Sequence, residues 1–509
     1  MTEAFDLPFS FQHLSLPAGV RSAMLRDPDK IALRHRENQQ SYGQFMARVD
    51  SVTSGILEDV GLKRGEHSAI VSANSIEYLE IVLGASQAGI GSATINPRLT
   101  PDEIVAICDD AEAKLLFVDD AAAEALKGKN FATVHRIIII GDDYEAWLSS
   151  SPELKAIPVV EEWDTFTIPY TSGTTGKPKG VLVPHRSRVI SLFSMAVEYG
   201  CYTPDDRFLA IAPICHGAGM IFAIAPIFFG GYVEIMDKFE PELVVRKFKD
   251  ESITGFFGVP THFHAIFSLE KKLLEEFRSE TLHTIISNAA PLPQAMKEKI
   301  IDHFGPILHE TYGSTEASIV SNLRPPDQLR KQACVGQPFP GTQLEIRRED
   351  GSICEADEVG ELFTSSPCLF NGYWQKPEAT SEAFKDGWVT VGDLAKRDSE
   401  GHLYIVDRIK DMVISGGVNI YPRDIEEVLI KHPQINDAAV IGVPDEKWGE
   451  RLKAFIVASA AGAITEEQIL NYLEGKISGM KTPKEFVFID QLPRNASGKV
   501  LKTDLRLIK

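Results

Sequence analysis

Short apolar runs alternate with helix-like runs along most of this chain, and this alternation limits the fold more than any other feature. In the first third of the chain, strand-like runs lie at residues 67–71, 93–96, 114–118 and 136–140. Helical patterns lie between some of them, at residues 76–88 and 101–110. Further strand-like runs lie at residues 208–212, 233–235, 253–257 and 284–287. Strands separated by helices favour a mostly parallel sheet covered on both faces. The sequence therefore predicts an α/β fold.

The first helix carries its own start signal. Ser41 is followed three positions later by Gln44, which is the spacing of a capping box. Apolar residues then recur every three or four positions until Gly61. We therefore expect a helix between Ser41 and Gly61.

The pattern changes in the last third of the 509 residues. Short strands and turns predict a smaller β subdomain at about residues 330–406. From residue 421 the order helix, strand, strand, helix, strand predicts a small α+β module of ordinary domain size. We expect a large N-terminal domain at 1–406, a hinge at 407–411 and a small, mobile C-terminal domain at 412–509.

Residues 170–180 form a Gly-rich stretch with the sequence Tyr-Thr-Ser-Gly-Thr-Thr-Gly-Lys-Pro-Lys-Gly. Such a loop turns tightly and exposes backbone N–H groups, and Lys177 and Lys179 add positive charge. That chemistry suits a polyphosphate, although a Gly-rich turn alone is often only solvated surface. It is not a Walker A loop, because only two residues separate Gly173 from Gly176 and a proline follows Lys177.

A second polar cluster, His-Glu-Thr-Tyr-Gly-Ser-Thr-Glu, occupies residues 309–316 after a strand-like run at 306–308. We expect a sharp turn at Gly313 that presents Tyr312, Thr315 and Glu316 beyond the strand end, where ligands bind in open α/β sheets. An aromatic ring can stack on a purine, and a carboxylate can hold Mg²⁺ against phosphate oxygens. A polar turn without a ligand is the alternative interpretation.

These motifs, with three more, resemble those of the adenylate-forming superfamily, which comprises acyl-CoA synthetases, peptide-synthetase adenylation domains and luciferase-like enzymes. The resemblance extends from about Asp27 to Lys502, with five motifs in the family's order. It implies that the Gly-rich loop grips ATP phosphates, that Thr315 contacts the α-phosphate and that Glu316 holds Mg²⁺. The cofactor-binding residues that it implies are Thr171, Ser172, Gly173, Thr174, Thr175, Gly176, Lys177, Lys179, Asn288, Ala289, Ala290, Tyr312, Gly313, Asp393, Arg408, Gly416 and Gly417.

Within that set the resemblance assigns separate parts of the ligands. Tyr312 and residues 288–290 match the adenine-contacting segments, and Asn288 stands where many relatives have glycine. Asp393 and Arg408 match the ribose contacts, because a carboxylate suits two hydroxyl donors. Gly416 and Gly417 match the lining of the pantetheine channel, and Lys410 matches the hinge position.

The resemblance also assigns the chemistry of the first step. A carboxylic acid is ionised at neutral pH, with a pKa of roughly 4, so the obstacle is bringing one anion against another. Fixed cations address this directly. Lys499, in a flexible C-terminal loop, matches the lysine that reaches the acyl carboxylate and the α-phosphate. A lone surface lysine carries no such implication by itself.

Two apolar segments, residues 214–222 and 256–263, match the family's acid-binding pocket. The pocket residues implied are His216, Gly217, Met220, Phe257, Val259 and His262. We interpret His216 as a wall and gate of the pocket, although a lone histidine is more often a packing residue. None of these positions supplies an Asp for an α-amino group, which argues against amino acids and favours an aryl, cyclic or medium-chain acid.

We therefore predict an ATP-, Mg²⁺- and coenzyme A-dependent acid–thiol ligase that forms an acyl-AMP intermediate. An enzyme that loads an acyl group onto a separate carrier protein is the main alternative. A luciferase-like oxidase shares the motifs and is less favoured. A catalytically dead nucleotide-binding protein is disfavoured, since Lys177, Glu316, Asp393, Arg408 and Lys499 are all present.

Composition narrows the partners and the location. The net charge of -20 argues against a general nucleic-acid binder. Six scattered cysteines fit a reducing compartment, and the N-terminus lacks a signal-peptide pattern. Proline and histidine interrupt the apolar stretch at 210–232, so we expect a buried helix there and no transmembrane segment. We expect a cytoplasmic enzyme, and whether it is a monomer or a homodimer stays open.

Overall fold

The structure is a computed structural model that describes residues 14–172, 178–459, 464–494 and 500–508. By its internal contacts the chain divides into two compact units. Unit 1 comprises residues 1–343 and 365–389, and unit 2 comprises residues 344–364 and 390–509. The expected hinge at 407–411 concerns movement between domains, so it stays a prediction.

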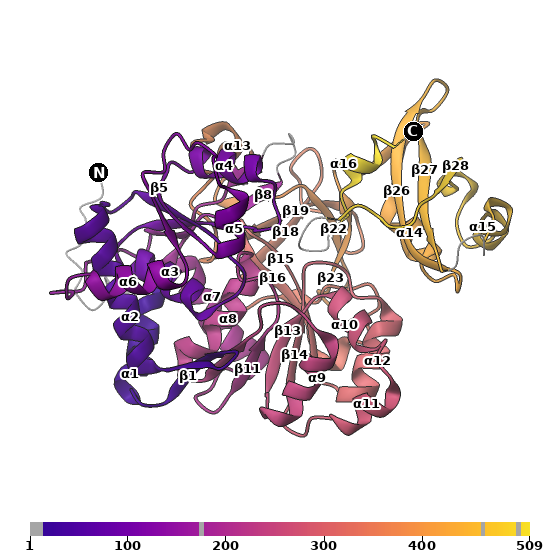
Figure 1. The fold of residues 1–509 in the computed structure, drawn as a ribbon. Helices are drawn as coiled ribbons and strands as arrows, with labels where there is room; N and C mark the ends of the chain where they lie inside the picture. Colours follow the sequence, from indigo (N-terminus) through magenta and orange to yellow (C-terminus); the bar gives the residue numbers. More distant parts are fainter. Residues whose placement is uncertain (1–13, 173–177, 460–463, 495–499, 509) are drawn as a thin grey trace. The chain divides into compact units, whose positions relative to one another are not determined.

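The larger sheet of unit 1 has nine strands, of which the central six are parallel, as the alternating pattern predicts. Antiparallel pairs complete it at both ends. Several of these strands are labelled in Figure 1. Their order across the sheet is β17 (Gln337–Pro338), β16 (Ser318–Leu323), β15 (Leu308–Ser314), β14 (Thr284–Ser287), β13 (Gly255–Gly258), β11 (Arg207–Ala210), β12 (Tyr232–Ile235), β1 (Ile31–His35) and β2 (Asn38–Ser41).

The second sheet of unit 1 has six strands, all parallel to their neighbours except at one edge. Their order is β10 (Val183–Pro184), β7 (Thr165–Thr167), β4 (Gly91–Ile95), β3 (His67–Val71), β5 (Ala113–Val118) and β6 (Arg136–Ile139). β3 is buried along its whole length, because helices cover both faces of a parallel sheet.

Two helices of unit 1 are buried on almost every side. α3 (Ile76–Gln87) contacts strands of both sheets, including β1 and β4. α8 (Gly217–Phe229) contacts β11, β12 and β13 on one side and α1 (Leu16–Arg26) on another. A helix without a polar face is a buried helix. The expected buried helix within residues 210–232 is therefore confirmed as α8.

The remaining helices of unit 1 are shorter or amphipathic. They are α2 (Tyr42–Ser54) with its π-helical extension (Gly55–Val60), α4 (Pro101–Asp110), α5 (Asp120–Ala125), α6 (Asp142–Ser150), α7 (His185–Tyr199), α9 (Pro241–Asp250), α10 (Pro260–Ile266), α11 (Lys271–Glu276), the 3₁₀ turn Pro325–Asp327, α12 (Gln294–Phe304) and α13 (Pro377–Ala383). A short hairpin of β20 (Phe384–Lys385) and β21 (Trp388–Val389) follows α13.

The predicted capping box of α2 is confirmed. The Ser41 hydroxyl accepts from the Gln44 N–H, and the Gln44 side chain accepts from the Ser41 N–H at 2.9 Å. After Ser54 the helix continues in π geometry and ends at Gly61, whose φ of +76° is the left-handed conformation that favours glycine. The expected end of the helix is thus also confirmed.

Unit 2 contains two groups of paired strands, and in the second group one edge strand pairs parallel with its neighbour. One is formed by β18 (Gln343–Arg347), β19 (Gly360–Ser365), β22 (Asp393–Arg397) and β23 (Leu403–Arg408). The other is formed by β25 (Val418–Ile420), β24 (Val413–Ser415), β27 (Gly449–Ala458), β26 (Ile435–Asp445) and β28 (Glu485–Phe488). The helical segments of this unit are α14 (Pro422–Leu429), α15 (Glu466–Leu473), the 3₁₀ turn Gly479–Lys481 and α16 (Lys502–Leu505).

Two expected elements need correction. The strand predicted at residues 306–308 runs instead from Leu308 to Ser314, so Tyr312 and Gly313 lie inside β15. The two consecutive strands that the pattern after residue 421 predicts, each a short apolar run, extend to form the long hairpin of β26 and β27 in Figure 1. In both cases pairing with a neighbouring strand continues the extended backbone past the apolar run.

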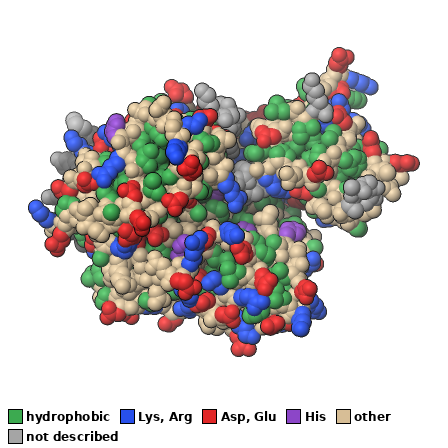
Figure 2. All heavy atoms as spheres, in the orientation of Figure 1, with side chains coloured by type: hydrophobic (Ala, Val, Ile, Leu, Met, Phe, Trp, Pro, Cys, Tyr) green, Lys and Arg blue, Asp and Glu red, His purple; other side chains and the backbone are tan. Residues whose placement is uncertain are grey.

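Three further features bear on the predictions from composition: the helix lengths, the cysteines and the surface charges. No helix in the part of the chain that the structure describes is both long enough and apolar enough to cross a bilayer. All six cysteines are free thiols, and five of them are buried. On the face seen in Figure 2, acidic and basic side chains are interspersed.

Candidate active site

A two-stranded hairpin in unit 1 carries the Gly-rich stretch. β8 (Tyr170–Ser172) pairs antiparallel with β9 (Pro178–Gly180), and Thr171 lies opposite Lys179. The predicted phosphate-binding residues Gly173, Thr174, Thr175, Gly176 and Lys177 lie outside the described residues. The hairpin holds both ends of this loop at one place.

Glu316, the predicted Mg²⁺ ligand, is buried and hydrogen-bonded. Its carboxylate accepts from the Tyr373 hydroxyl at 2.8 Å. The Lys179 ammonium nitrogen lies 5.0 Å from the centre of the same Tyr373 ring. Burial, and then the charge of Glu316, raise the pKa of Tyr373. The phenol therefore stays protonated and can serve as the hydrogen-bond donor. Tyr373 thus joins Glu316 to the hairpin of the Gly-rich stretch.

Gly313 is required for a steric reason. A Cβ at this position would lie 2.1 Å from the carbonyl oxygen of Ser318 on the neighbouring strand. The expected turn at Gly313 is wrong, because Gly313 lies inside β15 and pairs with Ile319 of β16. The chain turns after Ser314 instead, where the Ser314 hydroxyl accepts from the Ala317 N–H at 3.1 Å. This later turn carries Thr315 and Glu316 past the end of β15.

The predicted adenine segment follows β14. The Asn288 side-chain amide donates to the Thr311 hydroxyl at 2.9 Å, and its oxygen accepts from the Ala289 N–H. Ala289 has a φ of +76°, a conformation that few residues other than glycine adopt readily. Asn288 therefore fixes the path of the Asn288–Ala290 loop and ties it to β15.

Two parallel strands, β13 and β14, end side by side at this edge, next to β15, which continues to Ser314. Gly258 of β13 lies opposite Ser287 of β14, and Ser287 lies opposite Glu310 of β15. The residues that follow are Val259, Asn288 and Thr311. The predicted acid pocket and the predicted adenine segment consequently meet at the carboxyl edge of one sheet, which is where ligands bind in such sheets.

His216 caps the start of α8 with its backbone. Its Nε2 lies 3.5 Å from the Asn96 side-chain nitrogen, just beyond the end of β4. Burial, and then the charge of Arg98, lower the pKa of His216. A neutral imidazole fits the predicted role as a pocket wall, and it can accept or donate one proton according to its tautomer.

Apolar side chains dominate the remaining predicted pocket residues. Met220 and Phe257 are buried in one hydrophobic cluster, and the Phe257 ring stacks on Phe222 with centroids 4.4 Å apart. The His262 ring stacks on Phe239 at 4.3 Å. Burial lowers the pKa of His262 to about 4, so this imidazole is also neutral at physiological pH.

The predicted ribose residues lie in unit 2 and contact each other. Asp393 begins β22 and lies opposite Arg408 of β23. The Arg408 Nε lies 3.0 Å from an Asp393 oxygen, and Asp393 is almost fully buried. An ion pair of this kind holds the carboxylate in one orientation, as a residue that binds two hydroxyl groups requires.

The other predicted residues of unit 2 are Lys410, Gly416, Gly417 and Lys499. Burial, and then the charge of Arg408, lower the pKa of Lys410. Gly416 and Gly417 have φ values of +58° and +79° and form the two-residue turn between β24 and β25, which is where a tight hairpin requires left-handed residues. Lys499 lies outside the described residues.

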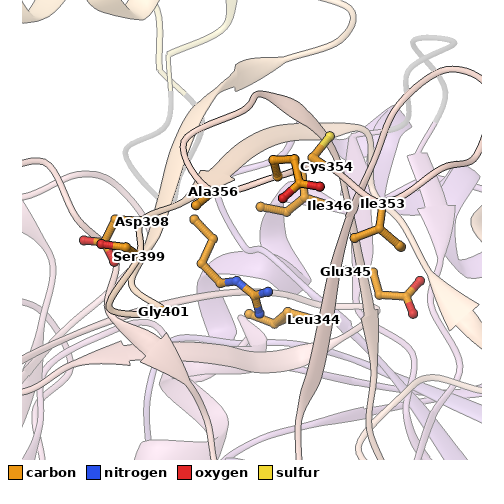
Figure 3. Close-up of a pocket in the computed structure, with 11 residues that line it drawn as sticks. Leu344, Glu345, Ile346, Ile353, Cys354, Ala356, Asp398, Ser399 and Gly401 are labelled. Atoms are coloured by element: carbon orange, nitrogen blue, oxygen red, sulfur yellow. The ribbon is translucent and has the colours of Figure 1, made fainter.

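A separate cavity lies in unit 2 and shares no residue with the predicted site. It has a volume of about 400 Å³ and is lined by residues of β18, β22 and the connections around them, including Leu344, Ile353, Cys354 and Asp398 (Figure 3). Its lining includes the charged residues Glu345, Arg397 and Asp398 and none of the predicted pocket residues. We therefore do not assign the acid substrate to it.

The described residues contain no group of three or more His, Cys, Asp or Glu side chains that could hold a metal ion. A Mg²⁺ ion does not need such a group, since it is commonly bound by one or two carboxylates together with substrate phosphates. Glu316 alone therefore fits the metal site that the sequence predicts.

Two residues of this region were not predicted from the sequence. Tyr373 lies 57 positions from Glu316, and no local pattern connects them. Arg188 on α7 is buried beside Gly217. A signal for Arg188 existed, since it shares helical spacing with the buried residues Leu192 and Met195.

The two sheets, the motif-bearing edge and the separate C-terminal module define the class of AMP-forming ligases. Comparison of the sequence with family models agrees. Residues 20–374 match the model of the AMP-binding enzyme family, and residues 424–499 match the model of the AMP-binding enzyme C-terminal domain. The chain belongs to the AMP-binding enzyme family, in its AMP-forming acid–CoA ligase branch.

Individual relatives agree with this assignment. A 2-succinylbenzoate–CoA ligase of Bacillus cereus (strain AH820) is 33% identical over 494 residues, which cover 97% of this chain and 98% of the relative. The structure of ATP-bound MatB from Rhodopseudomonas palustris has a TM-score of 0.88 at 29% identity, covering 97% of this chain and 98% of the other. The o-succinylbenzoate CoA synthetase (MenE) of Bacillus subtilis, in complex with the acyl-adenylate intermediate OSB-AMP, has a TM-score of 0.85 at 28% identity, covering 96% and 97%.

Proposed function

We propose that this chain activates a hydrophobic aryl, cyclic or medium-chain carboxylic acid as acyl-AMP and transfers the acyl group to coenzyme A. The observation that carries the proposal is the shared edge of β13, β14 and β15. Phe257 and Val259 pack in an apolar cluster at the end of β13, while Asn288 follows β14, Tyr312 lies in β15 and Glu316 follows β15. An acid and a nucleotide bound there would have their reacting groups in contact.

The chain's own residues have distinct tasks in this proposal. Tyr312 stacks on the adenine, and the Asn288–Ala290 loop lies along its edge. Thr315 donates to the α-phosphate, while Tyr373 keeps the Glu316 carboxylate in place. Mg²⁺ held at Glu316 would offset the negative charge of the phosphate oxygens. Lys499 and Lys177 are assigned to the carboxylate and the phosphates, respectively.

The thiol step needs little from the chain. A thiol with a pKa near 8.5 already has a modest thiolate fraction at neutral pH. We assign His216 to the boundary between the acid pocket and the thiol channel, where its neutral ring excludes water. A cytoplasmic location and a hinge at Lys410 belong to the same proposal.

The proposal is tested by separating the two half-reactions. Lys499→Ala should lower pyrophosphate release by at least about 10²–10³-fold, the typical effect of losing one preorganised donor. Transfer to coenzyme A from a supplied acyl-adenylate should persist. An equal fall in both half-reactions would contradict the role of Lys499.

The metal site has its own test. Tyr373→Phe should raise the Mg²⁺ concentration needed for half-maximal rate by about tenfold or more, because a hydrogen bond to a charged group contributes about 1.5–3 kcal/mol and about 1.4 kcal/mol is a factor of ten. The acid KM should stay the same. A change confined to the acid KM would argue that Tyr373 lines the pocket instead.

Loading of a carrier protein is the alternative. AMP formation that depends on added coenzyme A, with an acyl-CoA product detected by mass spectrometry, supports the ligase. AMP formation that requires a phosphopantetheinylated carrier domain and ignores coenzyme A would favour the alternative. Either result identifies the acceptor directly.

A further inference from the structure

Arg188 is a buried cation on α7. Only 6% of its surface is exposed, and within the described ranges it has no hydrogen bond and no ion pair. Its neighbour Arg186, by contrast, forms an ion pair with Glu162 at 2.8 Å. A guanidinium carries five N–H donors and no acceptor. Arg188 therefore carries strong donors that no described residue accepts.

The surroundings of Arg188 offer no compensation. A void beside it, too small for a water molecule, is otherwise lined by apolar side chains, namely Leu16, Phe166, Met220, Ile221 and Ile224. Burial lowers the pKa of Arg188 to about 10, which still leaves it charged at neutral pH, and the one charge that acts on it is the weak acid Cys368. Burying a charge without a partner is costly, and such a cost is kept where a ligand supplies the partner.

The guanidinium lies against the start of α8. Its Nη2 is 3.0 Å from the position that a Cβ on Gly217 would occupy. Gly217 is the first residue of this 13-residue helix, and no side chain caps the helix there. The first N–H groups of a helix carry partial positive charge and point outward. A lone cation and an uncapped helix start thus lie next to each other, and both favour an anion.

The neighbours of Arg188 on α7 contact segments that flank Glu316. One residue before Arg188, the Ser187 hydroxyl donates to the Cys368 carbonyl at 2.6 Å, and Phe370 donates its N–H to the Glu316 carbonyl at 2.9 Å. One helical turn after Arg188, the Ser191 hydroxyl lies 2.8 Å from the Ser318 hydroxyl. Both flanks of Arg188 therefore contact the segments beside Glu316.

Gly217 and Met220 are also predicted walls of the acid pocket, so an anion at Arg188 would be part of the acid substrate. We propose that Arg188 and the start of α8 bind a second, non-reacting carboxylate, and that the preferred substrate is a dicarboxylic acid with a hydrophobic body. The proposal rests on the ligase function proposed for this site. A guanidinium matches a carboxylate with two parallel hydrogen bonds, which a neutral substrate group cannot reproduce.

The experiment compares matched acids that differ by one carboxylate. The pairs are 2-succinylbenzoate with 3-benzoylpropionate, and suberate with octanoate, each assayed by pyrophosphate release. The native enzyme should prefer the diacid of a pair by about 10²-fold or more in kcat/KM, because leaving a buried charge unpaired is strongly penalised. Arg188→Met should abolish this preference while changing the rate with the monoacid by less than about threefold. Arg188→Lys should retain part of it.

Controls separate this proposal from its rivals. Arg186→Met removes a neighbouring, ion-paired arginine and should leave the preference unchanged. A fall in activity toward both acids alike would mean that Arg188 binds the reacting carboxylate, and would overturn the proposal while the ligase function stands. A native preference for the monoacid would also overturn it.

Binding is measured independently of turnover. Titration calorimetry with suberate should show binding to the native protein and at least tenfold weaker binding to Arg188→Met, whose folding is checked by circular dichroism. If no acid supports pyrophosphate release but this difference in binding persists, the proposed function fails and the anion site stands. Equal binding to both proteins would overturn the anion site.

Discussion

Two buried cations of unit 1 stand in opposite situations. Lys297 on α12 is 2% exposed and forms an ion pair with Glu310 on β15, whose other oxygen accepts from the Leu292 N–H at 3.0 Å. Arg188 on α7 is about as deeply buried, and the described residues give it no such partner. Lys297 has its charge balanced by the fold itself.

The difference indicates what each charge is for. A buried ion pair fixes how two elements pack, and removing one partner leaves the other charge uncompensated. Glu310 belongs to the same motif as Tyr312 and Glu316, so its pairing with Lys297 anchors the strand that presents them. Arg188 has no such partner among the described residues, so it fixes no packing between two described elements and is available to a ligand.

The largest expected effect is on the paired cation. Lys297→Met should lower the free energy of unfolding by about 3–5 kcal/mol, because Glu310 would remain buried and unpaired. Urea denaturation measures this. Lys299→Met, an exposed position on the same helix, is the control and should change stability by less than about 0.5 kcal/mol.

The next effect is the coupling within the pair. Adding Glu310→Gln to Lys297→Met should recover about 2 kcal/mol or more relative to the single variant, because the charge that lacks a partner is removed. Glutamine keeps an oxygen for the Leu292 N–H. Strict additivity of the two changes would show that the ion pair is not what stabilises this packing.

Removing the unpaired cation should have a smaller effect and the opposite sign. Arg188→Met should leave the free energy of unfolding unchanged or raise it by up to about 2 kcal/mol, since an uncompensated buried charge is lost. A loss above 2 kcal/mol would erase the contrast with Lys297. It would indicate that Arg188 is held by a partner in the native protein.

The smallest effect at neutral pH concerns His185, a third buried base, three positions before Arg188. Burial lowers the pKa of His185 to about 4, so it avoids the cost by staying neutral. The contribution of His185 to the free energy of unfolding is fully present above the pKa of about 6.5 that it has in the unfolded chain. It is lost as the pH falls toward 4, because only the unfolded chain binds the proton in that range.

His185→Asn should therefore reduce the loss of stability between pH 6.5 and 4 and leave the slope above pH 7 unchanged. Urea denaturation at a series of pH values measures this slope. The exposed His135→Asn is the control. A slope that is the same in both variants would show that His185 does not titrate differently on folding.

The sequence predicted the parts of the fold whose cause is local. The capping box at Ser41, the left-handed end at Gly61 and strand β3 at residues 67–71 appear where the pattern places them. The turn at Gly313 was misplaced, because strand pairing with β16 extends β15 to Ser314. Pairing depends on a neighbour, which a local pattern does not contain.

The sequence by itself determined the family, and the motifs that resemble that family predicted a phosphate loop, a carboxylate for a metal and an apolar acid pocket. Only the tertiary structure decided which charges meet. It brought Tyr373 to Glu316 and Lys297 to Glu310, and within the described residues it gave Arg188 no partner. The physical reason is that local patterns depend on backbone geometry over a few residues. Whether two residues distant in sequence form a pair, or a charge is left without one, is decided only when the chain folds.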